Sequence, residues 1–90
     1  MLTDRQSELY SDFYESTHDN EFLDTKTEIL VGLAAAMAMD CIPCTKYYLK
    51  LAERNRIPEE ETSEVLAKVM AVAAGQKRLQ TMQASREMKK

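Results

Sequence analysis

Hydrophobic residues recur at helical spacing along most of the chain and predict four helices. The first covers residues 3–18, where Leu9, Tyr10, Phe13 and Tyr14 lie on one face and acidic residues lie on the others. Only two glycines and two prolines occur among 90 residues, which favours helix throughout. The pattern therefore predicts an all-α protein, a compact bundle of four helices within a single domain, residues 1–90.

The second predicted helix, residues 24–39, contains an apolar run of 11 residues, 29–39. This run is too short to span a bilayer, so we expect no membrane association. A helix that is apolar on every face must be covered all round by its own chain or by partners. A chain of this length also builds only a modest core of its own. We therefore expect residues 24–39 to form the central helix of a homo-oligomer.

The ends of the last two helices are marked by local signals. Asp40 is predicted to cap the third helix, residues 40–55, with Pro43 in its first turn. Pro58, followed by three glutamates, is predicted to begin the fourth helix. Gly75 either ends that helix or permits a close crossing, and Leu79 indicates that helix resumes or continues. The final residues are expected to fray.

A second hydrophobic stripe is predicted on the fourth helix, where six apolar residues are expected to be buried. They are Val65, Leu66, Val69, Met70, Val72 and Ala73.

Charge is unevenly distributed along the chain. The net charge is −3, but residues 1–28 hold eight acidic and two basic residues, whereas residues 75–90 hold one acidic and five basic residues. These segments are either two solvated helical faces or an acidic N-terminus drawn to the basic tail of the same or a neighbouring chain. The acidic balance argues against nucleic-acid binding. No signal peptide is visible, and a cytoplasmic location is expected.

The sequence Cys41-Ile42-Pro43-Cys44 is the strongest candidate for chemistry. With Asp40 as the cap, both cysteines lie in the first turn of a helix, where the N–H groups and the helix dipole favour a thiolate. Asp40 itself disfavours the thiolate because it is a neighbouring negative charge. The spacing also allows the two sulfurs to form a disulfide. In a reducing compartment such a pair is more often reactive than structural.

Other interpretations of the cysteines remain open at this point. Both could be buried and inert, acting as small hydrophobic residues. A zinc site normally needs four ligands, and the chain adds only His18, so we expect neither a metal nor another cofactor. Tyr48 lies one helical turn after Cys44 and can donate a hydrogen bond to a thiolate, but it is a poor base at neutral pH.

The order of these features resembles the carboxymuconolactone decarboxylase/alkylhydroperoxidase D-like family. The resemblance covers residues 23–74: Asp24-Thr25-Lys26-Thr27, an alanine-rich apolar helix, the cysteine pair, Ile57-Pro58-Glu59-Glu60-Glu61 and Val65-Leu66-Ala67. It implies an all-helical fold and a trimeric or hexameric assembly. Redox members of this family reduce peroxides or disulfides.

By motif position, the resemblance assigns Cys44 as the attacking thiol and Cys41 as the resolving thiol. The family's proton relay adds a histidine, whose place Tyr48 holds here, and a glutamate. Glu28 lies one residue from the glutamate position, and one residue turns a helical side chain by about 100°. His18 either folds back as the missing base or is an exposed polar residue at a helix end.

Two functions therefore remain. The first is a thiol–disulfide redox protein, possessing at most weak peroxidase activity, that uses an external thiol reductant protein and a peroxide or disulfide substrate. The second is a non-catalytic oligomeric helical protein with packed or redox-sensing cysteines. Retention of both cysteines favours the first, and the departures from the relay favour the second. The sequence leaves open whether the protein is an enzyme, and it offers no convincing acid–base set for the decarboxylase reaction.

Overall fold

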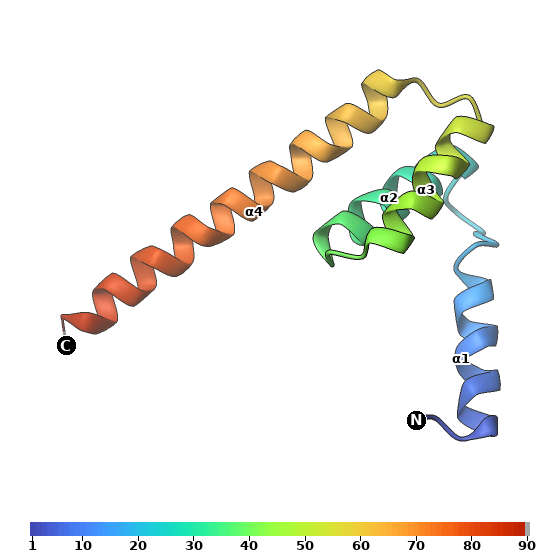
Figure 1. Ribbon diagram of the computed structural model, residues 1–90, viewed down its shortest axis with the longest axis horizontal. Coiled ribbons are helices and arrows are strands. Elements are labelled where there is room, and N and C mark those ends of the chain that lie inside the picture. Colours follow the sequence, from blue (N-terminus) through green and yellow to red (C-terminus); the bar gives the residue numbers. More distant parts are fainter. Residues whose placement is uncertain (90) are drawn as a thin grey trace.

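The computed structural model describes residues 1–89, and four α-helices follow one another along them (Figure 1). The helices are α1 (Asp4–Ser16), α2 (Thr25–Ala38), α3 (Ile42–Arg54) and α4 (Glu59–Met88). The prediction of an all-α fold with four helices is confirmed.

Helix α2 is the centre of the packed part of the chain, because both α3 and α4 contact it. The buried side chains are few: Ile29, Leu33 and Ala36 on α2, and Ala52 on α3. An ion pair between Lys26 and Glu61 joins the beginnings of α2 and α4. The chain's own core is therefore centred on one face of the α2–α3 pair.

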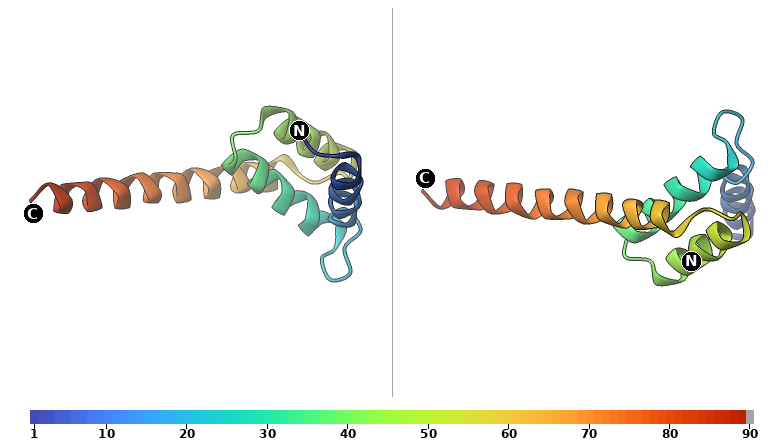
Figure 2. Two further views of the ribbon diagram at one scale, coloured as in Figure 1. Left: turned by 90° about the horizontal axis from the view of Figure 1, so that it is seen from below. Right: turned by 90° about the horizontal axis from the view of Figure 1, so that it is seen from above.

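The packing is more open than that of a compact bundle. Helix α1 and the C-terminal part of α4 extend away from the α2–α3 pair in different directions (Figures 1 and 2). The radius of gyration is 17.4 Å, whereas a compact chain of this length has about 12 Å. Two of the four helices thus extend well beyond the small core.

The stripe predicted to be buried on α4 is largely exposed in the single chain, which corrects that expectation. Val65 and Val69 are half-buried, but Met70 and Val72 are 61% and 66% exposed. The reason is that, among the described residues, α4 makes its helix contacts mainly with α2, so the side chains on its other faces stay uncovered. Helical periodicity identified an apolar face but not what covers it.

The predicted beginnings of the first two helices are close to those observed. Thr3 caps α1, and Gln6 completes a capping box with it. Asp24 caps α2 by accepting a hydrogen bond from the Thr27 N–H at 2.7 Å. Hydrogen bonding to Thr27 lowers the pKa of the Asp24 carboxyl from its usual range. Both caps satisfy N–H groups that have no partner within the helix.

The predicted cap of α3 is wrong: Cys41, not Asp40, holds the N-cap position. Asp40 has a positive φ of 57° and so belongs to the left-handed turn that ends α2. The N–H groups of Asp40 and Cys41 donate to the carbonyls of Met37 and Ala36 at 3.1 and 3.0 Å. Because Asp40 forms the turn that ends α2, the cap of α3 falls on the next residue, Cys41.

Helix α4 continues through Gly75 as far as Met88. In the described part of the chain, no atom outside the helix lies within 4 Å of a Cβ placed at Gly75. Gly75 therefore neither ends the helix nor marks a close crossing here. The expected fraying does not affect residues up to Met88, and Lys90 lies outside the described residues. None of the helices described in residues 1–89 has the length and apolar character to cross a membrane.

Candidate functional site

Cys41 and Cys44 form a disulfide at the start of α3. Their Cα atoms are 5.3 Å apart, which is an ordinary separation for bonded cysteines. Cys41 is half-buried in the turn between α2 and α3, whereas Cys44, in the first turn of α3, is exposed. Cys44 is therefore the more exposed residue of the pair.

The sulfur of Cys41 occupies the anion-binding position at the helix start. As the N-cap, its Sγ accepts a hydrogen bond from the backbone N–H of Cys44 at 3.2 Å. A thiolate accepts such a bond more strongly than a neutral sulfur, and the helix dipole adds to the effect. Release of the disulfide therefore leaves a favourable place for negative charge on Cys41.

Both cysteines line an open, mostly apolar hollow of about 480 Å³. The other residues around it are Tyr14, Gly32, Ala35, Ala36, Met39, Pro43, Tyr47 and Tyr48. Helices α1, α2 and α3 all contribute to this surface. Its character suits a small hydrophobic molecule approaching the disulfide.

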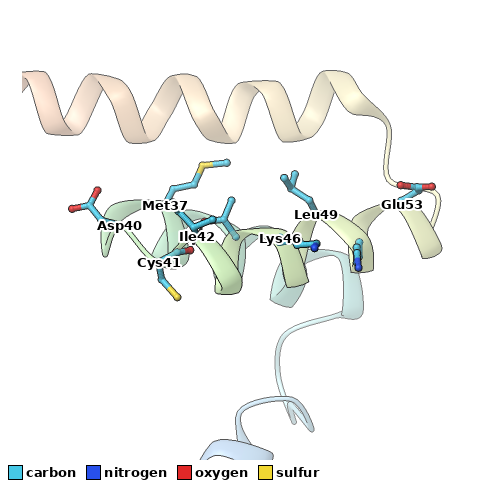
Figure 3. A pocket seen from close by; sticks show the side chains of 9 residues that line it. Met37, Asp40, Cys41, Ile42, Lys46, Leu49 and Glu53 are labelled. Atoms are coloured by element: carbon cyan, nitrogen blue, oxygen red, sulfur yellow. Dashed lines mark hydrogen bonds between the residues drawn. The ribbon is translucent and has the colours of Figure 1, made fainter.

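A second hollow, of about 580 Å³, lies on the other side of Cys41 and is lined by the end of α2, the turn that follows it and α3. Met37, Ile42 and Leu49 point across it toward α4, whereas the sulfur of Cys41 points away (Figure 3). The Cys44 side chain does not line it. The larger hollow is therefore not the one that gives access to the exposed sulfur.

Tyr48 lies across α2 at Gly32. A Cβ added at Gly32 would overlap the ring of Tyr48 near its hydroxyl end. Burial raises the pKa of Tyr48 above its usual value, and the negative charge of Glu28 raises it further. Tyr48 is thus a neutral hydrogen-bond donor at physiological pH, and the absence of a side chain at Gly32 permits its position.

His18 folds back onto this group of residues from the segment between α1 and α2. Its Nδ1 lies 3.5 Å from Oε1 of Glu28, and both side chains are mostly buried. The imidazole ring packs between Tyr14 and Tyr47, with ring centroids 4.8 and 6.0 Å away. Of the two alternatives for His18, the structure shows the one in which it folds back.

The structure thus brings Cys41, Cys44 and Tyr48 to one hollow and places Glu28 beside His18 behind it. Sequence reasoning missed the roles of Tyr14 and Tyr47, which hold the His18 ring, and of Gly32. The sequence shows that Tyr47 lies on the same helix as Cys44 and Tyr48 and that Tyr14 lies on the first helix. It does not show that these two helices meet at His18. Among residues 1–89, no group of three or more His, Cys, Asp or Glu is arranged to bind a metal ion.

Comparison with known proteins identifies the family. Neither a curated protein nor a solved structure matches the chain. The model of the carboxymuconolactone decarboxylase family matches residues 7–87, which extends beyond the segment 23–74 on which the resemblance rests. Because this match covers most of the chain, and because the four helices and the cysteine pair agree with it, the protein belongs to the carboxymuconolactone decarboxylase family.

Proposed function

We propose that this protein is a thiol–disulfide redox protein that reduces hydroperoxides or disulfides through Cys41 and Cys44. The observation that carries the proposal is the closed disulfide at the start of α3, with the exposed Cys44 in an apolar hollow. A disulfide that spans only three positions contributes little to fold stability, because it closes a very small loop. Its exposure instead fits repeated opening and closing.

In the peroxide reaction, Cys44 is the attacking residue. Its thiolate attacks the terminal oxygen of the hydroperoxide, the O–O bond breaks, and a Cys44 sulfenic acid and an alkoxide result. The Cys41 thiolate then attacks the sulfenic sulfur and displaces hydroxide, which takes a proton to form water. The two electrons that reduce the peroxide come from the two thiols, which end as the disulfide.

An external dithiol returns the pair to its reduced state. One thiolate of the reductant attacks the exposed sulfur of Cys44, and Cys41 leaves as a thiolate. The bond from the Cys44 N–H to Cys41 Sγ stabilises this leaving group. The second thiol of the reductant then releases Cys44. The same hydrogen bond thus stabilises the thiolate of Cys41 both when it acts as the resolving thiol and when it is the leaving group.

Tyr48 is proposed to donate the proton that the departing alkoxide needs. An alkoxide is a much stronger base than a phenolate, so a phenol gives up its proton to it even with its pKa raised by burial. Glu28 is near enough for its charge to raise the pKa of Tyr48, and His18 Nδ1 lies 3.5 Å from Glu28, so this pair is the proposed route by which Tyr48 regains its proton. In this role Tyr48 acts as an acid, and a neutral tyrosine is better suited to donating a proton than to accepting one.

The cycle fits a reducing compartment such as the cytoplasm, in which an external thiol reductant protein is present. We also expect the chain to assemble as a homo-oligomer, a trimer or a hexamer as the resemblance implies. Val31 and Met39 on α2 are exposed in the single chain, and association would cover them.

The test is peroxide consumption by the reduced protein with dithiothreitol as the reductant. The wild type should turn over repeatedly. The matched variants Cys44→Ser and Cys41→Ser should differ. The first should be inactive, and the second, treated with peroxide after dithiothreitol has been removed, should stop at a sulfenic acid that dimedone labels. Reaction of the wild type with one equivalent of peroxide and no turnover would instead indicate a redox sensor. No reaction at all would contradict the proposal.

A further inference from the structure

Two helical segments have apolar faces that nothing within residues 1–89 covers. One is α1, and the other is residues 76–88, which we call the free half of α4. Both extend away from the α2–α3 pair (Figures 1 and 2). Phe13 on α1 is 66% exposed, and Leu79 on the free half is 61% exposed. The length, apolar face and charge of each segment indicate its partner, and they do so independently of the proposed redox function.

Helix α1 has a single apolar face with an acidic edge. Leu9 and Phe13 are four residues apart, so their side chains lie one above the other. Glu8 and Asp12 lie on the edge next to Leu9, by the helical turn of about 100° per residue. Four acidic residues and one arginine give α1 a net charge of −3.

The free half of α4 has a matching face with the opposite charge. Leu79 and Met82 lie one turn apart and continue the face on which Val72 borders the contact with α2. Arg78 lies at the edge next to Met82, whereas Arg86 lies one turn after Met82, nearly in line with Leu79 and so at the end of the apolar face. Three basic residues and one glutamate give residues 76–88 a net charge of +2.

The free half of α4 is long enough to lie along the whole of α1. Each has 13 residues and is therefore about 20 Å long. Within one chain they cannot meet without a rearrangement, because α1 and α4 point in different directions and their ends lie far apart (Figure 1). Pairing of like segments from two chains would place acid beside acid, or arginine beside arginine. Pairing of unlike segments opposes their charges and covers both apolar faces.

We propose that α1 of one copy of this chain packs along the free half of α4 of a second copy. Leu9 and Phe13 lie against Leu79 and Met82 of the neighbouring copy, and the acidic edge of α1 lies beside the arginines. The two surfaces of this contact, α1 and the free half of α4, differ from each other, and each copy of the chain carries both. Such an interface closes either as a reciprocal dimer or as a ring.

This contact also reaches the cysteine site. Tyr14 of α1 lines the hollow with the cysteines and packs on the His18 ring, and α1 ends at Ser16. Helix α1 is otherwise held by few contacts, since none of its residues is buried within the described chain. Docking on a second copy would therefore fix the position of Tyr14 beside the hollow and, through it, that of the His18 ring.

The test is a charge-reversal series followed by light scattering at fixed ionic strength. Two reversals on α1, Glu8→Lys with Asp12→Lys, should weaken association at least tenfold, and so should Arg78→Glu with Arg86→Glu on α4. The four substitutions in one chain should restore most of the association, because the charges are opposed again. The matched control, Glu21→Lys with Glu64→Lys, changes the net charge as the α1 pair does but lies off both faces.

The apolar part of the contact is tested separately. Leu79→Asp should abolish association, whereas Ala84→Asp, on the opposite side of the same helix, should leave it unchanged. Far-ultraviolet circular dichroism must show that each variant keeps its helix content. A wild type that remains at the monomer mass of 10.3 kDa at tens of micromolar would overturn the proposal. So would reversed variants that associate as the wild type does, or a fourfold variant that regains nothing.

Discussion

The contact between Gly32 and Tyr48 allows a direct test of the site's geometry. In the Gly32→Ala variant, a methyl group replaces a hydrogen where the Tyr48 ring already lies, so the two would overlap. Either the ring or helix α3 must move. Gly75 is the matched control, because it also lies inside a helix but has open space around it in the described chain.

The expected magnitudes follow from two opposing effects. Alanine is favoured over glycine inside a helix by about 1 kcal/mol, which applies to both variants. Overpacking at Gly32 costs about 1–3 kcal/mol in addition. Gly75→Ala should therefore stabilise the protein by about 1 kcal/mol, and Gly32→Ala should be neutral or destabilising by up to about 2 kcal/mol. The difference between the variants measures the overlap itself, because the helix preference cancels.

The assay is urea and thermal unfolding followed by circular dichroism, at one protein concentration because association shifts the apparent stability. For a chain of this size, the midpoint of Gly75→Ala should exceed that of Gly32→Ala by about 4 °C or more. In a Tyr48→Ala background, Gly32→Ala should become stabilising, since the ring is gone. Equal stabilisation by the two glycine substitutions in the wild-type background would refute the close approach of Tyr48 to α2.

Three further predictions concern the same site. Burial raises the pKa of Tyr48 in the folded protein above the ordinary tyrosine value of 10.0. As the pH rises, the unfolded chain therefore loses this proton first, and the free energy of unfolding should fall until the pH passes the folded-state pKa. Tyr48→Phe should reduce that fall in unfolding measurements between pH 9 and 11, and an unchanged fall would contradict the raised pKa. Reduction of the Cys41–Cys44 disulfide should cost no more than about 2 kcal/mol by urea unfolding, because the loop is so short; a much larger loss would indicate a structural disulfide. His18→Ala should slow peroxide turnover at least tenfold while leaving the reaction of the disulfide with dithiothreitol unchanged, and loss of both would point to a structural role.

Much of the secondary structure could be predicted, because it depends on neighbours in the sequence. The predicted beginnings of the first two helices, at residues 3 and 24, lie within one residue of the observed beginnings at Asp4 and Thr25. The exchange of Asp40 for Cys41 as the cap of α3 was missed because it depends on how the preceding helix ends. A left-handed residue at the end of α2 shifts the next helix by one position, and no local spacing rule contains this information.

The contacts between helices were predictable to a smaller extent. Helical spacing placed Tyr48 one turn from Cys44, but not its ring over Gly32, because that depends on how closely α2 and α3 pack. His18 reaches Glu28 through a turn whose course depends on the packing of α1 and α3 against its ring. The exposure of the stripe on α4 was missed for the same reason, because a periodic pattern shows which face of a helix is apolar but not what packs against it.

The most direct test of the central claim is the reduction potential of the Cys41–Cys44 pair. The protein would be equilibrated in glutathione mixtures of stepped potential, trapped with an alkylating agent and analysed by mass spectrometry for its oxidised fraction. Structural disulfides have potentials below about −300 mV. Because Cys44 is exposed and the Cys44 N–H stabilises Cys41 as a leaving thiolate, we predict a midpoint above that value. A pair that remains fully oxidised at about −300 mV would contradict a redox function.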